Sequence, residues 1–319
     1  MASAAWFVRP LVRLGAAAML PLLVPGLITG IVWALPGDPA EIICPPGTCS
    51  GTAALAGRWH LDEGPWAFYR WWLSAAAQGD FGRSWRVMQG VPVRELLDGA
   101  VPVTLSLVGV SGLLVLAGVG LAVTGVAGRR AEVVASVAGI APVVLLALLG
   151  AAMVELRYGA DAFVDEAVRW RLIAAIGVLT VADGALGLAV GGARAVITAE
   201  RHQRYVAVGE LRGEGVLANV LPNVGPALAG QLRARFVHLL SGAVVVEVVL
   251  RLDGVGDLLW RATLLQDFGV VLAAATFFAV LSGVALAVQA AVELGLGWMI
   301  RRSPAVAPPV TSAAPRGLP

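Results

Sequence analysis

The amino-acid sequence predicts an all-α, polytopic membrane protein with six transmembrane helices and one polar cytoplasmic loop. Of its 319 residues, 58% are hydrophobic and only 14% are charged, whereas soluble domains contain about 25% charged residues. Six mostly apolar runs are each near the length of about 20 residues that crosses a bilayer. Clusters of arginine follow these runs alternately, as the positive-inside rule predicts for a multi-pass protein.

The composition also narrows the function classes. A net charge of +2 gives no reason to expect a nucleic-acid partner. The three histidines are not paired at the spacing of a zinc-binding helix, and no serine has a general base nearby in sequence. We therefore predict no catalytic site, no metal site and no bound cofactor.

The first predicted span covers residues 11–34. Arg9 and Arg13 precede or open it, which places its start on the cytoplasmic side. A signal peptide is the alternative, but this apolar run is too long and no small-residue cleavage site follows it. Pro21 and Pro25 are tolerated within a membrane helix.

Residues 35–100 are predicted to form an extracytoplasmic region, because they carry five arginines against seven acidic residues. Cys44 and Cys49 lie here in the run CPPGTC. A disulfide that closes a tight outer loop and a pair of free thiols both remain open at this point.

The same region holds an aromatic cluster, with Trp66, Tyr69, Trp71 and Trp72 in WAFYRWW. An aromatic belt at the membrane interface is the expected interpretation. A docking surface for an external partner is the alternative.

Residues 101–300 are predicted to hold the remaining five spans, and residues 301–319 a disordered tail rich in proline and alanine. The predicted spans cover about residues 101–127, 133–154, 172–196, 225–250 and 269–297. Arginine clusters lie at 9–13, 129–130, 194–212 and 301–302. With six spans they all fall on one side, which predicts that both termini and the polar loop are cytoplasmic.

Ionisable residues inside spans are costly and mark candidate functional positions. Arg233, Arg235 and His238 lie within six residues of one another, so they cannot all face lipid cheaply. With Glu247 they are our candidates for the translocation pathway. Glu293 is instead expected to make a structural contact. These charges also keep open an ion-coupled secondary transporter as the alternative function.

The polar loop at about 199–222 is too hydrophilic to cross the bilayer and contains helix-forming residues. Gly209 would permit a sharp turn or a close backbone approach. One predicted helical face, able to press into the groove of a partner, consists of Val216, Leu217, Val220 and Leu221. A secondary transporter gives no reason for such a loop.

Four runs in order carry a resemblance to a known family. LPGDPAEII follows the first span, and HLDEGPWAFYRWW, QGDFGRSW and VPVRELL with VPVTLSL come next. The chain resembles the inner-membrane permease subunits of binding-protein-dependent ABC importers, in the dipeptide, oligopeptide and nickel branch. The resemblance continues over most of the chain, although the outer loop 155–171 is short for this branch.

The polar loop resembles the coupling loop of such permeases, E-A-A-x3-G-x9-I-x-L-P. Gly209 fills the glycine position, Asn219 stands where the family has isoleucine, and Leu221 and Pro222 match the final pair. The resemblance implies that this loop transmits the stroke of separate ATPase subunits. The residues assigned to it are Glu200, Arg204, Gly209, Arg212, Leu217, Asn219, Leu221 and Pro222.

The resemblance further implies the partners and the location. It implies a second permease subunit in a heterodimer, cytoplasmic ABC ATPases and an extracytoplasmic solute-binding protein, in the bilayer of a bacterial inner membrane. The chain lacks a phosphate-binding G-x-x-x-x-G-K-[ST] loop, so ATP hydrolysis is expected on the separate subunits. The substrate stays open among dipeptides, oligopeptides, nickel chelates and similar solutes.

Overall fold

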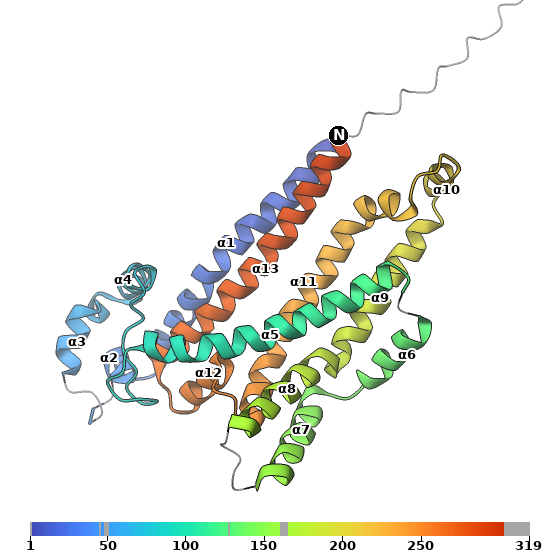
Figure 1. Ribbon diagram of the computed structural model, residues 1–319. Coiled ribbons are helices and arrows are strands. Elements are labelled where there is room, and N and C mark those ends of the chain that lie inside the picture. Colours follow the sequence, from blue (N-terminus) through green and yellow to red (C-terminus); the bar gives the residue numbers. More distant parts are fainter. Residues whose placement is uncertain (1, 45, 48–50, 127, 160–164, 303–319) are drawn as a thin grey trace, which may run out of the picture.

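The computed structural model describes residues 2–44, 46–47, 51–126, 128–159 and 165–302, and within these residues the chain is built of helices (Figure 1). The predicted all-α class is confirmed for the described residues. Of the predicted disordered tail, 301–319, the first two residues instead end helix α13, and the rest lies outside the described residues. The longer helices are α1 (Ala2–Ala34), α5 (Val93–Val123), α7 (Val143–Tyr158), α8 (Asp165–Val181), α9 (Ala185–Arg201), α11 (Val216–Leu250) and α13 (Phe268–Arg302).

Four described helices are long and apolar enough to cross a membrane. They cover Val8–Ala34, Val93–Val123, Asp165–Arg201 and Phe268–Trp298, and each contains or overlaps one predicted span. A bent pair provides a fifth candidate. The prediction of six transmembrane helices is thus confirmed in part.

The predicted third span, 133–154, is a broken element. Helix α6 (Arg129–Ala138) and α7 meet at an angle of 83°. Pro142 precedes α7 and lacks the N–H that would continue a helix. Gly139 lies so close to the 3-10 turn before α9 that an added Cβ would come 2.5 Å from the Gly184 Cα. The break therefore lets two backbones touch, which a side chain at Gly139 would prevent.

Helix α11 contains the predicted fifth span, 225–250, but is not among the candidates by length and composition. It is 35 residues long and carries Arg233, Arg235 and Glu247 in its C-terminal half. These charges lower its hydropathy below that of a lipid-facing helix. Its packing against α5, α7, α9 and α13 nevertheless places it within the helix bundle.

Helices α1 and α13 form a long antiparallel pair (Figure 1). Gly283 allows this approach, because an added Cβ would lie 2.7 Å from the carbonyl oxygen of Ala17. The carboxylate of Glu293 on α13 is paired with Arg13 on α1. The expectation that Glu293 makes an interhelical contact is confirmed.

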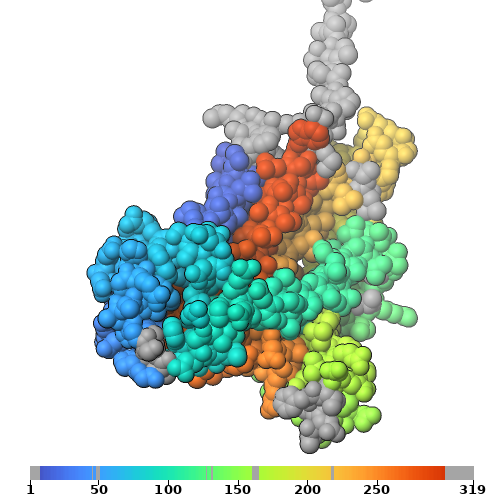
Figure 2. Space-filling model, turned by 60° about the vertical axis from the view of Figure 1, so that its left-hand side comes forward, coloured from blue at the N-terminus to red at the C-terminus, as the bar shows by residue number. Residues whose placement is uncertain are grey.

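Residues 36–92 form a small module beside the bundle, with helices α2 (Pro39–Ile43), α3 (Thr52–Arg58) and α4 (Pro65–Ala77). Its core is aromatic: Phe68 is fully buried and Trp72 is 2% exposed. The predicted interfacial belt is therefore wrong for Trp72, which faces inward, and Tyr69 and Trp71 are partly exposed. Only Trp66 of the cluster is largely exposed, at 64%. Figure 2 shows the module as a distinct lobe.

Cys44 belongs to the core of this module and is fully buried. It is not a free thiol. Cys49, its expected partner, lies outside the described residues, so the pairing of the two stays a prediction.

A carboxylate ties the module to the bundle. The Oδ2 atom of Asp267, next to the start of α13, accepts hydrogen bonds from the Ser84 hydroxyl at 2.6 Å and from three backbone N–H groups at 2.9–3.0 Å. These N–H groups belong to Trp85, Arg86 and Val87. Asp267 is 2% exposed, and one buried oxygen thereby fixes a whole turn of irregular chain.

The start of α1, the end of α13 and the short helix α10 (Arg204–Leu211) lie at one end of the molecule (Figures 1 and 2). Helix α12 (Val255–Leu264), the end of α7 and the start of α8 lie at the other. The predicted polar loop is therefore at the same end as both terminal helix ends.

Candidate functional site

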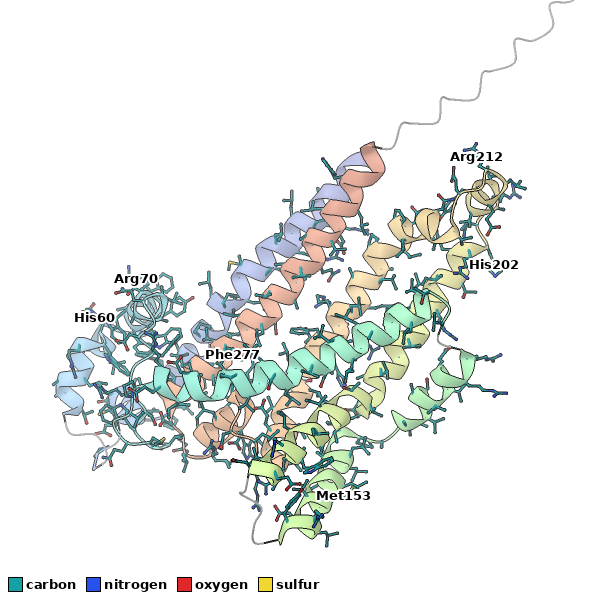
Figure 3. All side chains as sticks on the ribbon, viewed as in Figure 1. His60, Arg70, Met153, His202, Arg212 and Phe277 are labelled. Atoms are coloured by element: carbon teal, nitrogen blue, oxygen red, sulfur yellow. The ribbon has the colours of Figure 1, made fainter. Side chains whose placement is uncertain are left out.

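The polar loop folds as one short helix held away from the bundle. Helix α9 ends at Arg201, α10 covers Arg204–Leu211, and α11 begins at Val216. Gly213 makes the turn between α10 and α11 with φ +77°, a conformation that favours glycine. Arg212 and His202 mark this tip in Figure 3, far from His60 and Arg70 of the outer module.

Gly209 is a packing residue and not the turn. It lies within α10 and is buried, and an added Cβ would collide with the side-chain amide of Asn219 and lie 3.0 Å from the carboxylate of Glu214. The Asn219 amide donates to that carboxylate at 2.9 Å. Of the two predicted roles for Gly209, the close approach is correct and the sharp turn is wrong.

A second set of hydrogen bonds fixes α10 between its neighbours. The Tyr205 hydroxyl donates to Glu200 at 2.5 Å and accepts from the Asn223 amide at 2.8 Å. Burial and the hydrogen bond to Glu200 raise the pKa of Tyr205 above its ordinary value. The phenol stays protonated at neutral pH and links α9, α10 and α11 through three side chains.

The apolar inner face of this loop packs on its own bundle. Val206 is 1% exposed and Val220 is fully buried, and both join a cluster with Ile197 of α9 and Val224. The predicted partner-facing surface at 216, 217, 220 and 221 is therefore wrong for Val220. Leu221 is 40% exposed and Pro222 is partly exposed, whereas the side chain of Leu217 is outside the described residues.

The outer face of α10 presents apolar groups beside cations. Leu211 is 89% exposed, Val208 is 46% exposed, and Arg204 lies on the same face at helical spacing. Arg201 and Arg212 are also exposed at the rim. Sequence reasoning missed Val208 and Leu211, although their spacing of three residues on a short polar helix was a signal for an exposed apolar pair.

A groove of about 500 Å³ lies between α5, α11 and α13. Its wall is apolar, with residues such as Leu116, Leu232 and Val288, but Arg233, Arg235 and Gln289 also line it. Two of the predicted pathway residues therefore border the same open space. Arg235 also borders a second, more polar cavity between α6, α9 and α11.

Residues 114–297 match the family described as "Binding-protein-dependent transport system inner membrane component". The matched segment spans more than half of the chain and contains α9, α10, the groove-lining part of α11 and most of α13. The chain belongs to this family. No curated protein matches it.

Membership establishes an ABC-type transport permease, a membrane component of a transport system and not an enzyme. The family description does not name the energy source, so the ion-coupled alternative is tested by the transport experiment below. The matched segment ends near Trp298 and begins within α5, so the outer module lies outside it.

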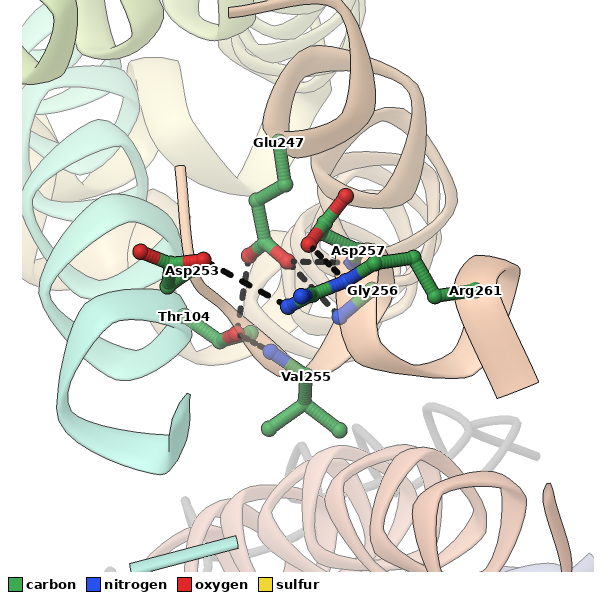
Figure 4. Close-up of polar contacts among 7 residues, drawn as sticks. All are labelled: Thr104, Glu247, Asp253, Val255, Gly256, Asp257 and Arg261. Carbon is green, nitrogen blue, oxygen red and sulfur yellow. Dashed lines mark hydrogen bonds and ion pairs between the residues drawn. The ribbon is translucent and has the colours of Figure 1, made fainter. Parts of the chain in front are cut away.

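Glu247 of this inner membrane component is a structural anchor and does not line the groove. It is fully buried. Its carboxylate accepts hydrogen bonds from the Thr104 hydroxyl at 2.8 Å and from the backbone N–H groups of Gly256 at 2.7 Å and Asp257 at 3.2 Å (Figure 4). Glu247 thus caps the start of α12 and joins it to α5.

Two glycines make room for this cap. An added Cβ at Gly254 or at Gly256 would collide with the Glu247 carboxylate or lie within 2.8 Å of it. Arg251, four residues after Glu247, is exposed and caps the end of α11 in the left-handed conformation at φ 53°.

His238 lies beside a kink and not in the groove. Its Nε2 atom is 3.8 Å from the carboxylate of Asp183, which sits in a short 3-10 turn with φ 51° between α8 and α9. The other Asp183 oxygen accepts from the backbone N–H of Val143, the first residue of α7. Asp183 therefore connects the kink between α8 and α9 to the start of α7, where the predicted third span is broken.

Proposed function

We propose that the chain is the permease subunit of an ATP-driven importer in the dipeptide, oligopeptide and nickel branch, and that its substrates are peptides. It forms half of a translocation pathway and pairs with a second permease subunit. Cytoplasmic ATPase subunits engage it from one side, and an extracytoplasmic binding protein delivers solute from the other.

The exposed face of α10 is the observation that supports this proposal. Val208 and Leu211, 46% and 89% exposed, form an apolar pair on one helix face with arginines at its rim, and a patch of this kind marks a protein–protein contact. Leu211 lies on a short helix whose position is fixed on the bundle side by Gly209, Asn219 and Tyr205. A rigid, protruding apolar tip rimmed by arginines is suited to enter a groove on another protein.

The peptide branch is supported by the outer module. The runs that carry the resemblance outside the matched segment fold against one another. Ile43, Leu61 and Phe68 share one buried core. Trp72 packs on Phe81 with ring centroids 6.4 Å apart. Ser84 in turn binds Asp267 at the start of α13. The residues that carry the resemblance to this branch thus form the outer module and attach it to the helix bundle.

The proposed location is the inner membrane of a bacterium, with both termini and α10 in the cytoplasm. The arginine clusters support this orientation. Helix α11 serves as the sixth crossing element in this proposal, since its charged residues face other helices or the groove. The proposed coupling residues remain Glu200, Arg204, Gly209, Arg212, Leu217, Asn219, Leu221 and Pro222, to which we add Val208 and Leu211.

The test uses the complete transporter, co-expressed with its second permease and ATPases and reconstituted with its binding protein. We expect ATP-dependent uptake of a labelled dipeptide. Leu211→Asp should reduce co-purification of the ATPases and abolish uptake, because a charge on the buried contact face costs a few kcal/mol.

The matched control is Leu264→Asp, at the end of α12 on the opposite side, where Leu264 is 64% exposed. Its ATPase content should be unchanged. Full ATPase binding and uptake in Leu211→Asp would contradict the proposal, as would uptake by this chain alone on an ion gradient.

A further inference from the structure

The polar groups that line the groove between α5, α11 and α13 are incompletely partnered. Most of the wall is aliphatic, and such a wall does not satisfy a buried polar atom. Two of these polar side chains, Gln289 and Arg233, each contain a buried atom without a hydrogen-bond partner among the described residues. They come from different helices, α13 and α11.

Gln289 presents a free acceptor in a fixed orientation. The residue is 5% exposed, and its Nε2 atom donates to Glu293 at 2.9 Å. Only the nitrogen end of the amide can donate to a carboxylate, so the Oε1 atom must be the opposite end. That oxygen is buried and accepts no hydrogen bond within the described part of the chain.

Arg233 presents a free donor and a free charge. Its Nε atom is buried without a partner, and among the described residues Arg233 makes no ion pair. It lies near the middle of the 35-residue helix α11. A cation at such depth in a membrane bundle is unfavourable unless an anion neutralises it.

The nearest acidic group on α13 does not serve as this anion. Glu293 is occupied by Arg13 and by the Gln289 amide. The chain Arg13–Glu293–Gln289 therefore neutralises itself and orients Gln289. The positive charge of Arg233 is left for a ligand in the groove.

The two groups line the same groove from adjacent helices. Gln289 lies beside α11 at Gly230, since an added Cβ there would lie 3.4 Å from its Nε2 atom, and Gly230 precedes Arg233 by three residues, about 4.5 Å along a helix. An acceptor and a cationic donor that line one groove match a carboxylate with a neighbouring N–H group.

We propose that this groove contains a solute subsite, in which Arg233 binds the terminal carboxylate of a peptide and Gln289 Oε1 accepts a peptide N–H. The proposal rests on the peptide-import function above. Arg233 and Gln289 are then specificity-determining residues of the pathway, and the aliphatic wall accommodates the peptide side chains. The ligand enters and leaves unchanged, with no covalent step.

The experiment measures the concentration dependence of dialanine uptake by the reconstituted complex. Arg233→Gln should lower uptake at least about tenfold, and Gln289→Leu should raise the KM about fivefold, in line with loss of a charged and of a neutral hydrogen bond. Arg233→Lys, which keeps the charge, should retain most of the uptake. A purely structural role of Arg233 would not distinguish lysine from glutamine in this way.

The matched controls are Gln231→Leu, on α11 but facing the other cavity, and Arg251→Gln at the exposed end of α11. Both should transport like the unmodified chain. Unchanged dialanine kinetics in Arg233→Gln and Gln289→Leu would overturn the subsite and leave peptide import standing.

Two other outcomes are distinguishable. Loss of the second permease subunit from the purified Arg233→Gln complex would assign the counter-charge of Arg233 to that subunit and overturn the subsite. Failure of the unmodified complex to transport dialanine and longer peptides would overturn the proposed function, and the subsite with it.

Discussion

At the scale of single residues, the contacts around Gly209 determine how α10 is held. The glycine has ordinary helical geometry, so its importance comes from the side chains of Asn219 and Glu214 that occupy the space of a Cβ. A substitution there is therefore a problem of packing, which a second substitution can relieve.

We predict that Gly209→Ala lowers ATPase co-purification and peptide uptake several-fold, because the added methyl displaces Asn219 from Glu214. Asn219→Ala removes the obstructing amide, so the double variant Gly209→Ala/Asn219→Ala should recover uptake beyond Gly209→Ala alone. A double-mutant cycle on uptake rates measures this coupling. Additive losses would show that the two residues act independently.

Glu247 was predicted from the sequence to line the translocation pathway, but in the structure it caps the start of α12. Its removal leaves the Thr104 hydroxyl and two backbone N–H groups unpaired in a buried place. We predict that Glu247→Ala destabilises the protein by at least about 2 kcal/mol. Glu247→Gln keeps one acceptor oxygen and should cost less.

Thermal unfolding of the purified protein in detergent measures this effect. Thr104→Val is the companion variant, since it removes one donor to Glu247 and one acceptor for the Val255 N–H. An unchanged midpoint in Glu247→Ala would contradict the capping role.

At the scale of elements, α13 begins where the outer module is attached. Asp267 accepts four hydrogen bonds from residues 84–87 through a single oxygen, while Phe268 packs on Phe68 with ring centroids 5.9 Å apart. This carboxylate and this aromatic contact thus fix the module to the start of α13, while the Tyr69 hydroxyl donates to the Leu22 carbonyl of α1.

We predict that Asp267→Ala releases the segment 84–92 without unfolding α13. Amide hydrogen exchange of this segment should accelerate markedly, because three backbone N–H groups lose their acceptor. Asp253→Ala is the control, since Asp253 has an 89% exposed side chain at the other side of α12. Equal exchange in both variants would argue against the attachment.

At the scale of the whole molecule, the elements and arginine clusters that gather at each end determine its orientation in the membrane. Helix α10 lies with the start of α1 and the end of α13, and α12 lies opposite (Figure 1). The arginine clusters in the sequence independently predict the same orientation, with these ends of the helices in the cytoplasm.

We predict that Leu211→Cys is labelled by an impermeant thiol reagent in inverted vesicles only, and Met88→Cys in intact cells only. Both residues are exposed in the chain itself, at 89% and 52%, so in membranes that contain the chain without its ATPases access depends on sidedness. The background is Cys44→Ser/Cys49→Ser. Labelling of position 211 from outside intact cells would reverse the topology.

The sequence by itself determined the membrane class, the helical fold, four of the spans and the location of the polar loop. These follow from local composition, since a run of about 20 apolar residues needs lipid wherever it lies in the chain. Residues 114–297, which include the polar loop, match a family of binding-protein-dependent transport components, as the resemblance implied.

Only the tertiary structure decided which residues each helix face contacts. Val220 is buried on its own bundle, Gly209 faces Asn219, Glu247 caps α12, and the third span breaks at Pro142. Periodicity along one helix identifies a polar or apolar position but not its partner. The partner of Glu247 is Thr104, 143 residues earlier in the chain, and the burial or exposure of a group depends on such distant contacts.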